Sequence, residues 1–338
     1  MRHPGTRLYA PEAFSGQRRA LSASWQIARF TPSDALWTPA DVGMDRVLLS
    51  EGKAYPNVCT HRAATLLDAP SSTLRCPYHG RQFGPGGALK VAPGCPTLPT
   101  GENLEPIATL AVGPWTFARY AGSRDFPDLS RWLQGVPLAG LERDPNGDRV
   151  YTINAHWALW VENYLEGLHV PFVHPGLRGA LDLGAYRTEI EDRVVVQIGV
   201  ARQEPYVPLP AGHVAGTNVG GLYLYIYPCT ALNIYAWGVS VNAIEPVSAT
   251  ETRIHYQRWV WPDTPVEVQT TGAGGALDDV EQEDDAIVER VARGVAKVAA
   301  HQGRLGSYVP GWEDGAQAFH RWLDEGLDEG LHGRKNER

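Results

Sequence analysis

The sequence has few cysteines, no long apolar run and no cluster of basic residues. None of its apolar stretches approaches the length of a membrane span, and the first five residues lack the apolar core of a signal peptide. Acidic residues outnumber basic ones, with a formal net charge of -8, so no basic surface is expected to meet a nucleic acid backbone. We therefore expect a cytoplasmic protein with neither membrane nor nucleic acid as a partner. Without an export signal, metal binding is a better expectation than disulfide formation for the two cysteines near histidines, Cys59 and Cys76, while Cys95 and Cys229 have no ligand pattern beside them and read as ordinary small residues.

Glycine and proline are plentiful, with 36 and 26 residues, which favours a chain rich in strands and turns over a helical bundle. A length of 338 residues suits two domains. We predict an N-terminal arm over residues 1–21, a small β domain over 22–124, a linker rich in Pro, Gly and Asp over 125–148, and a second domain over 149–338. In the second domain, successive strand patterns at 193–200, 222–227, 233–237 and 253–261 predict an antiparallel sheet.

The small domain contains two short metal-binding patterns. Cys59-Thr60-His61 and Cys76-Pro77-Tyr78-His79 each place one thiol and one imidazole on a tight loop. Two cysteines on one iron and two histidines on the other form the ligand set of a Rieske [2Fe-2S] centre. A zinc knuckle is the alternative, but zinc sites usually pair cysteine with cysteine and histidine with histidine.

A second pattern lies in the sequence from Glu162 to Pro175. On a helix, Glu166 and His169 share a face, and Pro171 is expected to end or kink that helix near Leu168, so that His174 can turn back toward His169. Two imidazoles and one carboxylate, with open positions left over, suit ferrous iron in enzymes that activate oxygen. Taken singly, each histidine would more often be an ordinary core or surface residue.

The third ligand is predicted by periodicity. Residues 278–300 read as a helix whose valines and isoleucine fall on one face, with Asp284 in the middle of that face. A carboxylate directed into an apolar core is costly unless it is paired, and a ferrous ion is a suitable partner. The helix could instead start late and leave Asp284 as a cap. The neighbouring acids are expected to point to solvent, namely Glu281, Glu283, Asp285 and Glu289.

Together these motifs, in this order and spacing, resemble the terminal oxygenase (alpha) component of the Rieske non-heme iron oxygenases, the ring-hydroxylating dioxygenase and monooxygenase family. The resemblance implies that one [2Fe-2S] cluster and one mononuclear Fe(II) are bound, by Cys59, His61, Cys76 and His79 and by His169, His174 and Asp284 respectively. It also implies that Glu166 bridges the two metal centres, and we assign Glu166 and Asn163 as catalytic residues. Three positions depart from the family pattern: Ala63 where glycine is frequent, Arg81 where tryptophan is frequent, and Leu168 where tyrosine is common.

The resemblance further implies an α+β fold, with an all-β Rieske domain followed by a helix-grip (START-like) catalytic domain whose antiparallel sheet wraps round a long helix. The chain has no nucleotide-binding glycine loop, so electrons are expected from a separate NAD(P)H-dependent reductase or ferredoxin. Family members are typically homotrimers in which the cluster of one subunit serves the iron of the next.

The implied function is insertion of oxygen from O2 into a small organic substrate. An aromatic substrate suits the aromatic-rich second domain, while aromatic walls equally suit a quaternary ammonium group, as in choline and carnitine monooxygenases. The sequence does not rank dioxygenation, monooxygenation and demethylation. Two other classes stay open: a Rieske electron-transfer protein with a non-catalytic second domain, and a ligand-binding helix-grip domain with a decayed iron site.

Overall fold

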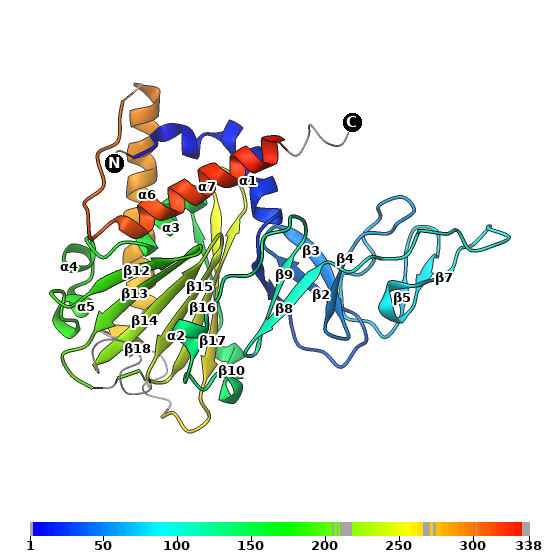
Figure 1. Cartoon of the computed structure of the whole chain (residues 1–338), viewed down its shortest axis with the longest axis horizontal. Coiled ribbons are helices and arrows are strands. Elements are labelled where there is room, and N and C mark those ends of the chain that lie inside the picture. The colour runs from blue at the N-terminus through cyan, green and yellow to red at the C-terminus, as the bar shows by residue number, and fades with distance from the viewer. Residues whose placement is uncertain are drawn as a thin grey trace. The chain divides into compact units, whose positions relative to one another are not determined.

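The structure, a computed structural model, describes residues 3–204, 206–207, 209, 218–265, 271–272, 275–301 and 303–332. The chain divides into two compact units (Figure 1). The smaller unit is Leu21–Arg124, and the larger one contains the residues before Leu21 and after Arg124.

The smaller unit is built almost entirely of strands. A six-stranded antiparallel sheet has the order β4-β3-β2-β1-β9-β8, and a three-stranded sheet has the order β5-β6-β7. A bridge between Ala54 and Ile107 brings the two edges of the larger sheet together. The elements are β1 (Gln26–Arg29), β2 (Thr38–Val42), β3 (Asp45–Ser50), β4 (Lys53–Pro56), β5 (Leu74–Arg75), β6 (Gln82–Phe83), η2 (Pro85–Gly87), β7 (Leu89–Val91), β8 (Ala108–Val112) and β9 (Trp115–Arg119).

The larger unit is organised round an eight-stranded antiparallel sheet, as the strand patterns predict. Its order is β10-β17-β16-β15-β14-β13-β12, and β11 also pairs with β17. Strands β13 to β16 are buried along nearly their whole length. The strands are β10 (Glu142–Arg143), β11 (Arg149–Ile153), β12 (Arg187–Glu191), β13 (Val194–Val200), β14 (Val219–Ile226), β15 (Thr230–Tyr235), β16 (Gly238–Pro246) and β17 (Thr252–Val260), with a separate pair, β18 (Thr271–Gly272) and β19 (Gly275–Ala276).

Three helices, α3, α6 and α7, cover this sheet (Figure 1). The predicted helix at 278–300 is confirmed as α6, and Val288 and Val295 are among its buried residues. Phe319 and Leu323 of α7 are fully buried. The helical elements of this unit are η1 (Thr6–Tyr9), α1 (Pro11–Ser22), α2 (Ser130–Leu133), η3 (Leu138–Gly140), η4 (Pro145–Gly147), α3 (Trp157–Tyr164), α4 (Val170–Val173), α5 (Pro175–Ala180), α6 (Leu277–Ala300) and α7 (Asp314–His332).

The two connecting stretches of the sequence are structured. The stretch predicted as an N-terminal arm forms η1 and α1, and its residues before Leu21 group with the larger unit. The stretch predicted as a linker contains α2 and β10 and groups with the same unit. Whether each predicted domain folds by itself stays a prediction. No helix of the described residues is both long and apolar enough to cross a bilayer.

Candidate active site

One side of the candidate iron site is formed by the turn that separates α3 from α4. This helix ends at Tyr164, earlier than predicted, and Pro171 lies in the first turn of the short α4 instead of ending a longer helix. The reason is Glu166, whose carboxylate accepts hydrogen bonds from the backbone N–H groups of Leu168 and His169 and so competes with helix continuation. Gly167 is required here, because a Cβ at that position would lie 2.7 Å from the ring of Tyr186.

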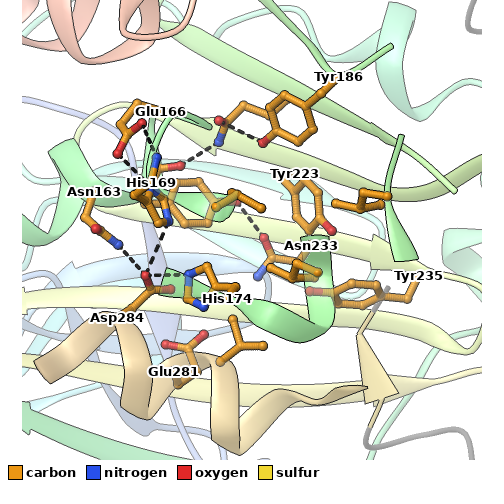
Figure 2. A pocket seen from close by; sticks show the side chains of 16 residues that line it. Asn163, Glu166, His169, His174, Tyr186, Tyr223, Asn233, Tyr235, Glu281 and Asp284 are labelled. Carbon is orange, nitrogen blue, oxygen red and sulfur yellow. Dashed lines mark hydrogen bonds and ion pairs between the residues drawn. The ribbon is translucent and has the colours of Figure 1, made fainter. Parts of the chain in front are cut away.

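Helix α6 supplies the carboxylate that completes the site. Oδ1 of Asp284 lies 3.0 Å from Nε2 of His174 and 3.5 Å from Nε2 of His169 (Figure 2). One ligand atom from each of these three residues lies within 4.8 Å of the other two. The structure therefore brings together the three residues predicted as iron ligands, although they come from α6 and from both ends of α4.

Each imidazole is held from its far side by another carboxylate. Nδ1 of His169 lies 2.6 Å from Glu166 Oε1, and Nδ1 of His174 lies 2.7 Å from Glu283 Oε2. Metal-binding histidines usually donate their second N–H in this way, which fixes the ring and leaves Nε2 for the metal. The donor set of two imidazoles and one carboxylate thus fits ferrous iron.

The charges of the site are strongly coupled. Burial alone would raise the pKa of Asp284, but hydrogen bonds from His169 and His174 lower it to about 2. Burial would lower the pKa of His169, but its hydrogen bonds with Asp284 and Glu166 raise it to about 9. The lowered pKa of Asp284 and the raised pKa of His169 show that positive charge is favoured between these side chains. A divalent cation would supply that charge.

The candidate cluster site lies in the smaller unit. Cys59 and Cys76 are buried and unbridged, whereas His61 and His79 are exposed, with ring centroids 4.9 Å apart. Two buried thiols beneath two exposed imidazoles suit a cluster with one inner and one outer iron.

Backbone N–H groups point at both sulfur atoms. The N–H groups of His61 and Arg62 donate to Cys59, and those of Tyr78 and His79 donate to Cys76. Although burial opposes it, these donors lower the pKa of the Cys76 thiol below its usual range. The loops therefore provide the hydrogen bonds that a cluster bound through thiolates requires.

Two of the positions that depart from the family pattern, Ala63 and Arg81, lie in the smaller unit. Ala63 has a φ of 56°, in the left-handed region that favours glycine, and its N–H donates to the Cys59 carbonyl at 3.0 Å. Gly80 occupies the equivalent place in the second loop, with a φ of 71° and a 3.1 Å bond to the Cys76 carbonyl. The buried guanidinium of Arg81 pairs with Glu102, whose carbonyl accepts a hydrogen bond from Thr60.

A pocket opens beside the three candidate iron ligands. It has a volume of about 90 Å³, room for roughly six waters, so it suits a small ligand. Tyr164, Tyr186, Tyr223 and Tyr235 line it, together with Glu281 (Figure 2). Tyr164 donates to Asn233 Oδ1 at 2.6 Å and Tyr186 donates to Gln197 Oε1 at 3.0 Å, so these two rings are held in place before a ligand enters.

Comparison with known proteins agrees with this geometry. The family model "Ring hydroxylating alpha subunit (catalytic domain)" matches residues 142–329, and the model "Rieske [2Fe-2S] domain" matches residues 39–102. The chain belongs to the ring-hydroxylating alpha subunit family. It is thus a Rieske oxygenase, and the predicted family, enzyme class, two-part fold and pair of iron cofactors are confirmed.

Individual relatives are more distant. A chloroplastic choline monooxygenase of Atriplex hortensis is 26% identical, covering 96% of this chain and 78% of that protein. A putrescine 2-hydroxylase of Ralstonia nicotianae is 24% identical, and the match covers 80% of this chain and 78% of that protein. A crystal structure of a quaternary ammonium Rieske monooxygenase superimposes with a TM-score of 0.73 at 20% identity, and the match covers 96% of this chain and 94% of that one. This last likeness shows the shared fold.

The Rieske oxygenase uses more of helix α6 than the sequence analysis allowed. The prediction that the neighbouring acids point to solvent is wrong for three of them: Glu281 lines the pocket, Glu283 holds His174, and Asp285 has a buried Oδ1, with burial raising its pKa to about 7. The fourth, Glu289, lies near the surface, where it accepts from the N–H and Nδ2 of Asn154 at 2.9 and 2.8 Å. Glu281 lies three residues before Asp284 and so shares its face, a signal that was available in the sequence.

A second cavity of about 300 Å³ lies near the first, and Asn163 and Glu166 line both. At its wall, Glu162 Oε1 accepts from Tyr9 at 2.6 Å and lies 2.7 Å from His320 Nε2, while its Oε2 lies 3.6 Å from His3. None of these residues was predicted to have a role, and they come together from the first ten residues, α3 and α7. Only the acid at position 162, close to the metal motif, could have drawn attention to them.

Proposed function

We propose that His169, His174 and Asp284 hold the mononuclear iron, and that Cys59, His61, Cys76 and His79 hold the cluster. For the iron, the support is the convergence of three donor atoms and the carboxylates behind the two imidazoles. For the cluster, it is two buried thiols that accept from backbone N–H groups and two exposed imidazoles whose ring centroids lie 4.9 Å apart. When bound, the two groups supply electron transfer and activation of O2. The chain's own side chains bind and orient the substrate beside that site.

We further propose that the substrate is a small compound with a cationic nitrogen. The observation that carries this proposal is Glu281, a carboxylate among four tyrosine rings in a pocket that no lysine or arginine lines among the described residues. Tyrosine faces attract a cation through their ring quadrupoles, and the carboxylate attracts it by charge. Choline and putrescine, named for two relatives, each carry such a nitrogen.

A neutral aromatic substrate is the second candidate. Four tyrosine rings would stack on it favourably. However, it would leave the pocket-facing oxygen of Glu281 without a hydrogen-bond partner, which is costly for a buried polar group whether or not it is ionised. The cation therefore accounts for more of the pocket.

As a Rieske oxygenase, the protein requires O2, an organic substrate and an electron donor. We propose that the donor is a separate reductase or ferredoxin and that the working assembly is a homotrimer. In such an assembly Glu166 would connect the iron of one subunit to the cluster of the next, because it holds Nδ1 of His169, the nitrogen that points away from the iron. The cytoplasmic location predicted from the sequence stays a prediction.

Metal counting and oxygen uptake test this function together. The protein is expected to contain three irons per chain, and His174→Ala is expected to contain two while keeping the visible spectrum of the cluster. With a surrogate reductase, oxygen uptake coupled to product is expected with small amines or quaternary ammonium compounds and not with naphthalene. Two irons in the unaltered protein would contradict the second metal site, and coupled turnover of naphthalene alone would contradict the cationic substrate.

A further inference from the structure

Glu281 is held by one oxygen only. Its Oε1 accepts a hydrogen bond of 3.1 Å from Nδ2 of Asn242, a residue on β16 that is 1% exposed. No other hydrogen bond or ion pair to Glu281 exists among the described residues. Asn242 thus fixes the carboxylate in the wall of the pocket and leaves Oε2 as a free acceptor.

Glu281 shares helix α6 with other acids. Burial first, and then Asp284, Asp285 and Asp278, raise the pKa of its carboxyl to about 8, although the hydrogen bond from Asn242 lowers it. No lysine or arginine among the described residues lines the pocket, so a cation that enters it would favour the ionised form of Glu281.

The kind of cation matters for the free oxygen. A quaternary ammonium group balances the charge of a carboxylate and contacts tyrosine faces well, but it has no proton to donate. A protonated amine also balances the charge, and in addition its N–H forms a charge-assisted hydrogen bond with a carboxylate oxygen. A buried acceptor left without a donor is costly, so the two cations are not equivalent at this position.

We infer that Oε2 of Glu281 accepts a hydrogen bond from an N–H of the substrate's ammonium group, so that the enzyme prefers a protonated amine over its quaternary counterpart. The inference rests on the cationic substrate proposed above and narrows it. Glu281 is then a specificity-determining residue that contacts the substrate and is not itself a metal ligand.

Calorimetric titration of the holoenzyme, reduced and without oxygen at pH 7, tests this with two matched probes. N,N-dimethylethanolamine is protonated at this pH and carries one N–H, whereas choline carries a methyl group in its place. We expect the unaltered enzyme to bind the dimethyl compound about tenfold more tightly, the gain typical of one charge-assisted hydrogen bond. Binding of choline with equal or greater affinity would overturn the inference.

Variants of the carboxylate locate the effect. Glu281→Met removes the acceptor and is expected to abolish the preference, and Glu281→Gln, which keeps an uncharged acceptor, to reduce it to about two- to threefold. The control Asp279→Asn removes a charge from an exposed position of the same helix and is expected to keep the full preference. An unchanged preference in both Glu281 variants would overturn the role of this residue.

A neutral probe separates this inference from the proposed function. The carbon isostere 3,3-dimethylbutanol has the shape of choline without its charge, and we expect it to bind at least tenfold more weakly than either cation. If it binds as well as both cations, the cationic substrate itself is contradicted. If both cations bind more tightly than the isostere but choline binds best, only the N–H preference is wrong.

Discussion

Nδ2 of Asn163 donates a hydrogen bond of 2.6 Å to Oδ1 of Asp284, the same oxygen that lies 3.0 Å from Nε2 of His174. This bond joins the end of α3 to the middle of α6. Asn163 was predicted to be catalytic, and its contact indicates a positioning role: it aims the carboxylate at the two imidazoles.

Asn163→Ala is therefore expected to weaken iron binding at the mononuclear site. Loss of a partner behind a metal ligand typically reduces metal affinity by about 10- to 100-fold. Iron content after dialysis against a chelator is expected to fall from three toward two per chain, with the cluster spectrum unchanged. Asn154→Ala, which removes an asparagine bound to Glu289 on the same helix, serves as the control and is expected to keep three irons. Full iron retention in Asn163→Ala would show that Asp284 is oriented without it.

Glu166→Ala is expected nearly to abolish substrate turnover even after reconstitution to three irons per chain. The carboxylate touches His169 at Nδ1, away from the metal-facing nitrogen, so its loss is expected to weaken iron binding by about 10- to 100-fold, which added iron restores, and to interrupt the proposed connection between the centres, which added iron does not restore. Stopped-flow oxidation of the reduced cluster by O2 and substrate is expected to slow in parallel. Normal turnover, or loss of iron matching the loss of activity, would refute the connecting role.

Ala63→Gly is expected to stabilise the smaller unit by about 0.5–1 kcal/mol. A non-glycine residue in the left-handed region pays a steric cost that exceeds the extra chain entropy of glycine. The melting temperature of the holoenzyme, followed by cluster absorbance, is expected to rise by a few degrees. Ala111→Gly, at an exposed position of β8, is the comparison and is expected to lower it. A fall in both variants would mean that this loop tolerates alanine without strain.

Glu162 is expected to make stability depend on pH in the acid range. Burial would raise its pKa, but His320, His3 and Tyr9 together lower it from 4.5 to about 2. A depressed carboxyl pKa stabilises the folded state above pH 4.5, and this contribution disappears as the pH falls from 4.5 toward 2. Its full size is on the order of 2–3 kcal/mol.

The free energy of urea unfolding, measured between pH 6 and pH 3, checks this. The difference between the unaltered protein and Glu162→Gln is expected to stay constant from pH 6 to about pH 5 and then to shrink as the pH falls to 3. Glu12→Gln, at an exposed position of α1, is expected to show no such trend. A difference that stays constant with pH would contradict the low pKa.

The two candidate metal sites could be predicted from the sequence, the cluster site from the spacing of its residues and the iron site from spacing and helical periodicity. Asp284 interrupts the apolar face of a long helix, and the cluster residues are close in sequence. The break after Tyr164 could not be predicted from propensity, because it depends on one carboxylate that takes the N–H groups of Leu168 and His169. The pocket was missed for a different reason: Tyr186 precedes β12 and Tyr235 ends β15, and only the folded sheet brings them to one place.

Helix α3 and the turn after it serve three partners from neighbouring positions: Glu162 meets the N-terminal residues and α7, Asn163 meets α6, and Glu166 meets His169. Inserting one residue after Val161 would turn everything beyond it by about 100° round the helix axis and move all three groups at once. A point substitution in this segment alters one of these contacts, whereas a change in its length alters all three, so natural variation in chain length is expected to fall elsewhere.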